Sequence, residues 1–123
     1  MEHSPGFLKL VNETRARIKE ITVAEARERL AQNASLVLLD VREDHEWQKG
    51  HAAHARHLGK GILERDLEKM IPDPDTEIIL YCGGGFRSAL SADAAKQLDA
   101  LRAEVVKFND VMTAAKAPFV PVP

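Results

Sequence analysis

The chain has 123 residues, 45% of them apolar and 29% charged, and a formal net charge of −2. This length predicts one globular domain, and the small net charge gives no reason to expect binding to nucleic acid or to an anionic membrane surface. No run approaches the roughly 20 consecutive apolar residues of a membrane span, so we expect no membrane partner. Because Cys82 is the only cysteine, an internal disulfide is excluded, and a reducing, cytoplasmic location is predicted.

Residues 1–20 predict a helical extension in front of the domain. Ser4 and Pro5 fit the N-cap and the first position of a helix, and apolar residues at helical spacing continue to about Lys19. We expect this helix to pack on the domain with its charged face in solvent. An arm that docks a partner or forms a dimer is the alternative.

Strand and helix patterns then alternate over residues 21–116, which we expect to form the domain. Strands are expected at 19–21, 36–39, 56–58, 77–81 and 104–108, and helices at 22–32, 43–49, 61–70, 88–99 and 111–116. Thr22 and Glu25 predict a capping box, and Trp47 is expected to anchor the core. The alternation predicts an α/β fold with a mostly parallel sheet and helices on both faces. A proline-rich tail at 117–123 follows.

The chemistry is expected just after the strand at 77–81. Cys82 follows that strand and precedes Gly83, Gly84, Gly85, Phe86, Arg87 and Ser88. Successive glycines let backbone N–H groups point at one atom, and such a nest binds anions. Ser88 is predicted as the N-cap of the next helix, whose N-terminus also favours negative charge, and Arg87 adds a permanent cation. We therefore expect the Cys82 thiol to ionise readily and to act as a nucleophile.

Two motifs resemble the single-domain rhodanese family of sulfurtransferases. The loop from Cys82 to Ser88 resembles the family's active-site loop, and Asp40-Val41-Arg42-Glu43 resembles its Asp-Val-Arg-Glu motif. The resemblance runs from about residue 21 to 108 and implies a three-layer α/β domain that works without a cofactor. It also implies that Cys82 takes sulfur from a donor such as thiosulfate and holds it as a persulfide against the N–H groups of residues 83–88. A thiol or cyanide would then accept the sulfur.

Two other functions remain open. Gly83, Gly84 and Gly85 offer only backbone groups, which would suit a persulfide carrier or redox-sensing module that needs an acceptor protein. A cysteine phosphatase or arsenate reductase would use the same cradle. However, four residues separate Cys82 from Arg87, whereas phosphatases of related fold carry one more, so the smaller loop favours sulfur.

Other polar residues receive weaker functional assignments. Asp40 and Arg42 are expected to support the active-site end of the sheet as an ion pair rather than to react. The histidines at positions 45, 51, 54 and 57 are close in sequence, but a zinc site needs ligands that converge on a tetrahedron, and no metal is predicted. Arg65 has two readings, one that reaches the pocket and a favoured one in which it is a solvated helix residue.

Overall fold

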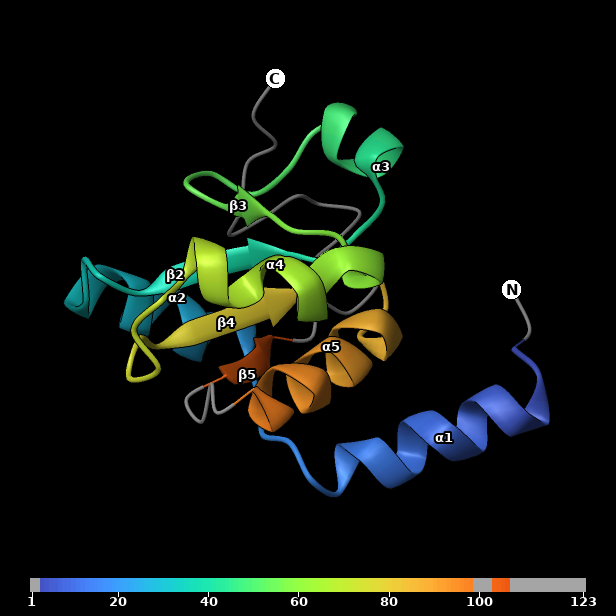
Figure 1. Cartoon of the computed structure of the whole chain (residues 1–123). Helices are drawn as coiled ribbons and strands as arrows, with labels where there is room; N and C mark the ends of the chain where they lie inside the picture. Colours follow the sequence, from blue (N-terminus) through green and yellow to red (C-terminus); the bar gives the residue numbers. More distant parts are fainter. Residues whose placement is uncertain (1–2, 99–102, 107–123) are drawn as a thin grey trace.

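The computed structural model describes residues 3–98 and 103–106. Figure 1 shows a central sheet with helices on both sides, and an N-terminal helix that lies beside the last of them. The helix expected at 111–116 and the tail at 117–123 lie outside the described residues. Within the described ranges, no helix combines the length and the apolar character that a membrane crossing requires.

The sheet has five strands, all paired in parallel, in the order β1-β5-β4-β2-β3. They are β1 (Glu20–Ile21), β2 (Val37–Asp40), β3 (Arg56–His57), β4 (Ile78–Tyr81) and β5 (Ala103–Val106). The predicted α/β class with a parallel sheet is therefore confirmed. All four residues of β4 are buried because this strand lies between β2 and β5. Its last residue, Tyr81, is in register with Asp40 at the end of β2, so both strands end at the same edge of the sheet.

Helices cover the two faces of the sheet and bury two apolar clusters. The described helices are α1 (Pro5–Arg15), α2 (Val23–Gln32), α3 (Asp44–Gln48), α4 (Leu63–Met70) and α5 (Phe86–Gln97), with a short 3₁₀ turn, η1 (Lys60–Ile62), before α4. Of these, α2, α4 and α5 supply residues of the two clusters. Successive residues of a strand point to opposite faces. Ile78 and Leu80 accordingly belong to the cluster under α4 and α5, and Ile79 belongs to the cluster under α2. Small buried alanines on α5 let this helix lie close to the sheet.

The predicted helix starts agree with the structure at two positions. Ser4 caps α1 by accepting a bond from the Phe7 N–H at 3.4 Å. Thr22 and Glu25 form the reciprocal capping box of α2, with both bonds at 3.1 Å. Each cap satisfies N–H groups that the first helical turn leaves without a partner. Helix α1 ends at Arg15, earlier than the sequence pattern indicated.

Two other predictions were wrong. Helix α5 begins at Phe86, and Gly85 occupies its cap with φ 88°, so Ser88 is not the N-cap but a buried residue of the first turn. Trp47 does not anchor the core, because α3 lies outside the two apolar clusters and contains no buried residue. The Trp47 indole instead stacks on His51, with ring centroids 3.4 Å apart, and on His57, with centroids 4.9 Å apart.

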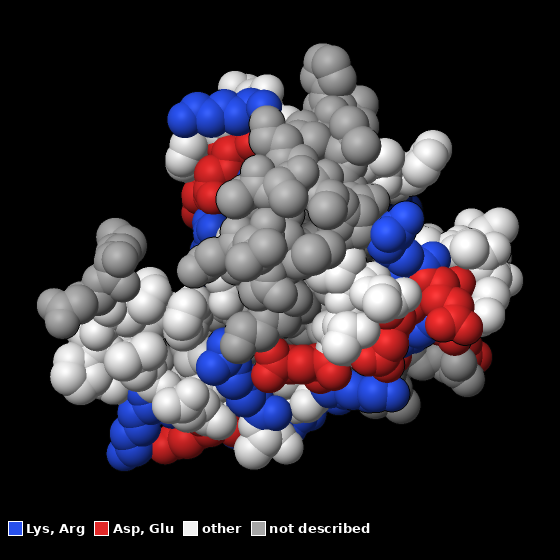
Figure 2. All heavy atoms as spheres, turned by 180° about the vertical axis from the view of Figure 1, so that it is seen from behind, with Lys and Arg blue, Asp and Glu red and all other residues white. Residues whose placement is uncertain are grey.

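Ion pairs tie α2 to strands β4 and β5. The Arg29 guanidinium lies 2.8 Å from a carboxylate oxygen of Glu104 in β5 and 3.3 Å from one of Glu77, which precedes β4. Lys19 approaches Glu104 at 3.5 Å. Figure 2, which shows the molecule from behind, has basic and acidic side chains beside one another on this side. These contacts stabilise the sheet away from the edge where β4 ends.

Candidate active site

Cys82 lies at the carboxyl edge of the parallel sheet, directly after β4 and before α5. Ligands of open parallel sheets bind outside this edge. The residue is only 3% exposed, and it forms no disulfide. The path from the central strand to α5 therefore places a thiol on the floor of the loop formed by residues 83–88.

Two backbone N–H groups point at the sulfur of Cys82. The Gly85 N–H donates to Sγ at 3.1 Å, and the Ser88 N–H does so at 3.4 Å. The Ser88 hydroxyl oxygen also lies 3.4 Å from Sγ and accepts the thiol proton in this arrangement. Because both N–H donors belong to the cap and first turn of α5, they favour negative charge on sulfur. The side chain of Ser88 thus hydrogen-bonds with the Cys82 thiol instead of capping the helix.

The cradle depends on the backbone conformation of Gly85. Its φ of 88° lies in the left-handed region, which residues with a Cβ adopt only at a cost. This conformation turns the Gly85 N–H toward Cys82 as the chain enters α5. Gly83 and Gly84 are exposed and form the open part of the loop.

Replacing Gly85 by alanine is expected to destabilise the chain by about 1–2 kcal/mol, the cost of a left-handed residue with a Cβ. It should also slow alkylation of Cys82, because strain there moves an N–H away from sulfur. Urea unfolding and the rate of iodoacetamide labelling measure the two effects. Gly61→Ala is the matched control, since an added Cβ there meets no atom within 4 Å. Equal behaviour of the two variants would contradict this role of Gly85.

The Arg87 side chain lies beside Gly83 of the loop and is held there by Glu46 of α3. The two side chains form a bidentate pair, with Nη2 and Oε2 3.1 Å apart and a second bond from Nη1 to Oε1. A Cβ on Gly83 would lie 3.6 Å from Arg87 Nη2, so the guanidinium extends over that glycine. The hydrogen bond from Arg87 is the main cause that lowers the pKa of Glu46 to about 2. The pKa of Arg87 is raised, first by Glu46 and further by Cys82.

The role of Glu46 was missed in the sequence. A permanent cation in a loop implies a carboxylate nearby, but the chain has 19 acidic residues. Glu46 and Arg87 are 41 positions apart, and only the packing of α3 beside the loop brings them together. Glu46 also accepts a bond from the Glu43 N–H at 3.1 Å, which fixes its carboxylate within α3.

Asp40 and Arg42 form a buried network behind the loop. Asp40 is fully buried and accepts bonds from the Arg42 guanidinium, at 2.8 Å from Nη2, and from the Tyr81 hydroxyl at 2.7 Å. The Tyr81 oxygen in turn accepts the Ala52 N–H at 3.0 Å, and Arg42 donates to the Gly50 carbonyl at 2.9 Å. Burial is the main cause that raises the pKa of Tyr81. The network joins β2 and β4 to the segment after α3, which supports the edge that carries Cys82.

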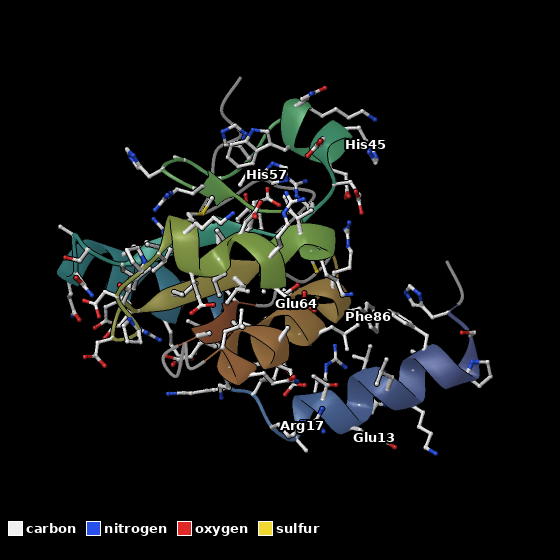
Figure 3. The ribbon with its side chains drawn as sticks, in the orientation of Figure 1. Glu13, Arg17, His45, His57, Glu64 and Phe86 are labelled. Carbon is white, nitrogen blue, oxygen red and sulfur yellow. The ribbon has the colours of Figure 1, made fainter. Side chains whose placement is uncertain are left out.

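The remaining polar candidates lie apart from the loop cradle. His57 contacts the Arg42 carbonyl at 2.8 Å, whereas His45 and His54 are exposed, and Figure 3 shows His45 and His57 on separate elements. In the part of the chain that the structure describes, no three His, Cys, Asp or Glu residues are grouped to hold a metal ion. Arg65 is 69% exposed and pairs with Asp66 on α4.

Known proteins resemble this chain in sequence and in fold. A family model described as "Rhodanese-like domain" matches residues 22–112. The Bacillus subtilis (strain 168) protein named "Putative sulfurtransferase YtwF" is 37% identical over 71 residues, which cover 58% of this chain and 67% of that protein. "Putative sulfur carrier protein YrkF" of the same strain is 29% identical over 86 residues, and the match covers 70% of this chain but only 45% of that protein.

Among solved structures, the fold is matched over nearly the whole chain. RPA3614 from Rhodopseudomonas palustris CGA009, described as a protein of unknown function and "Possible Tyrosine Phosphatase", superposes with a TM-score of 0.78. The match covers 97% of each chain at 24% sequence identity. At this identity the likeness concerns the fold.

Proposed function

Because this chain belongs to the rhodanese-like domain family, we propose that it is a sulfurtransferase that carries the transferred sulfur on Cys82 as a persulfide. The observation that carries the proposal is the pair of N–H donors from Gly85 and Ser88 on Cys82 Sγ. Such donors stabilise a thiolate, and the same cradle offers charge stabilisation to the outer sulfur of a persulfide. The single cysteine fits a reducing cytoplasmic location, in which other molecules accept the sulfur.

The proposed reaction has two displacement steps at sulfur. The Cys82 thiolate attacks the outer sulfur of thiosulfate, a new S–S bond forms, and sulfite leaves with the electron pair of the broken S–S bond. Cyanide or a thiolate then attacks the outer sulfur of the persulfide, and the Cys82 thiolate leaves. Covalent catalysis thus divides one transfer into two easier steps, and the charge of Arg87 favours anions at the mouth of the loop.

A persulfide carrier that serves an acceptor protein is the second candidate. It is favoured by the pairing of Arg87 with Glu46, which offsets part of the positive charge beside the loop. The exposed Gly83 and Gly84 also bring no charged side chain to a small dianionic donor. The relative named as a sulfur carrier points in the same direction. A phosphatase is disfavoured, because four residues between Cys82 and Arg87 make a small cradle.

Steady-state assays with two sulfur donor–acceptor pairs and one phosphate ester separate these functions. We expect thiocyanate formation from thiosulfate and cyanide, sulfur transfer from a polysulfide to a small thiol, and no hydrolysis of p-nitrophenyl phosphate. Loading of one sulfur without further turnover would assign the carrier function. Phosphate ester hydrolysis without any sulfur transfer would contradict the proposal.

A further inference from the structure

Helix α1 and the segment before it contact Phe86, the first residue of α5. The rings of His3 and Phe7 lie with their centroids 4.5 and 5.9 Å from that of Phe86. The Arg15 guanidinium carbon lies over the same ring, 5.3 Å from its centroid. Figure 3 shows Phe86 at the start of α5, on the side where α1 lies. Residues of α1, together with His3 two positions before the helix, therefore contact a ring that belongs to the loop.

The Phe86 ring also contacts the backbone of the loop. A Cβ built on Gly84 would lie 3.3 Å from two ring carbons of Phe86, so the ring packs closely over that glycine. In the chain, Phe86 stands between Gly85, whose N–H donates to the Cys82 sulfur, and Arg87, whose guanidinium pairs with Glu46. A displaced ring would thus change the positions of both neighbours.

Helix α1 is itself fixed to α5 farther along its length. Val11 and Thr14 are buried against the domain, at 0% and 1% exposure. After the helix, Arg17 forms two bonds of 3.0 Å with the Asp93 carboxylate, and Lys96 donates to the Arg17 carbonyl at 3.2 Å. Figure 3 shows Arg17 at the C-terminal end of α1. These contacts give α1 a defined position from which it can hold the ring.

We propose that Phe7 and Arg15 are positioning residues for the sulfur-binding loop. They hold the Phe86 ring against Gly84, and this keeps the Gly85 and Ser88 N–H groups aimed at Cys82. The expected effect of these residues on sulfur transfer rests on the proposed sulfurtransferase function. Their effect on the reactivity of the thiol follows from the geometry alone. In this account, α1 is part of the active-site structure instead of an independent arm.

The test compares Phe7→Ala, Phe7→Leu and the control Leu10→Ala, which truncates a side chain on the same helix that is 50% exposed. The rate of Cys82 alkylation is measured from pH 5 to 9, together with sulfur loading and thermal unfolding. An aromatic contact of ordinary strength predicts that Phe7→Ala lowers alkylation and loading at neutral pH by about 3- to 10-fold. Phe7→Leu keeps apolar packing but loses the aromatic contact, so it should fall between Phe7→Ala and the wild type. Leu10→Ala should match the wild type.

Equal alkylation of Phe7→Ala and Leu10→Ala, both folded, would overturn the proposal. If Phe7→Ala does not fold, Arg15→Met tests the proposal instead. This substitution removes the cation over Phe86 and leaves an unbranched apolar side chain in its place. Slower alkylation by this variant supports the proposal, and wild-type alkylation overturns it. A wild-type chain that alkylates but never loads sulfur would refute the proposed function, and the alkylation comparison would still decide the role of α1.

Discussion

Arg87→Ala is expected to lower the rate of sulfur loading on Cys82 by about 10- to 100-fold, the range for losing a hydrogen bond to a charged group. The guanidinium lies beside Gly83 of the loop and interacts electrostatically with Cys82. Its removal takes away the cation that faces an incoming anionic donor. In the wild type, Arg87 balances the charge of the Glu46 carboxylate. The variant leaves that carboxylate as an uncompensated negative charge beside the loop.

Stopped-flow or quenched loading with thiosulfate measures this effect. Arg65→Ala is the matched control, because it removes an exposed arginine from α4 that pairs with Asp66. Arg87→Lys should fall between wild type and Arg87→Ala, since lysine keeps the charge but not the bidentate geometry. Loading by Arg87→Ala as fast as by Arg65→Ala would contradict the assigned role of Arg87.

The pH dependence of the Glu46–Arg87 pair has a defined sign. The pKa of Glu46 is lowered to about 2, so the stability that the pair contributes is complete above the ordinary carboxyl range. It is lost only as the pH falls toward 2. In the wild type, titration of Glu46 therefore should not alter the loading rate between pH 5 and 9.

Asp40→Ala is expected to destabilise the fold by about 3–5 kcal/mol, the range for breaking a buried ion pair by removing one partner. Asp40 is fully buried, and its removal leaves Arg42 without its carboxylate. The Tyr81 hydroxyl also loses the acceptor that lies 2.7 Å away. Because these groups join β2 to β4, the loss affects the strand that directly precedes Cys82.

Urea unfolding measures the free energy directly. Asp40→Asn should lose less than Asp40→Ala, because an amide oxygen still accepts from Arg42 and Tyr81. Asp66→Ala breaks the surface pair with Arg65 and should change the stability little. A similar small effect of Asp40→Ala would show that the buried network contributes nothing of the expected size.

The part of the fold that follows from local pattern was predictable from the sequence. The apolar run before Cys82 indicated a buried strand, and the glycines after it indicated a tight entry into a helix. The alternation of such runs with helical patterns leads to a parallel sheet. Because parallel strands end at one edge, it also follows that Asp40 and Cys82 lie near each other.

The misses come from contacts that no sequence spacing encodes. Ser88 has the side chain of an N-cap, but left-handed Gly85 takes that position, and the serine instead meets Cys82. Trp47 is large and apolar, but α3 lies outside the core clusters, so its ring stacks on histidines. The partners of Arg87 and Phe86 lie on α3 and α1, and only tertiary packing brings these helices beside the loop.

The most direct test of the central claim is the intact mass of the protein after incubation with thiosulfate, with Cys82→Ser as the control. The account predicts that the wild type gains one sulfur atom, loses it when cyanide is added, and that the variant gains none. A wild type that gains no sulfur from thiosulfate or from a polysulfide, although its thiol still alkylates at neutral pH, would contradict the claim that Cys82 carries the transferred sulfur.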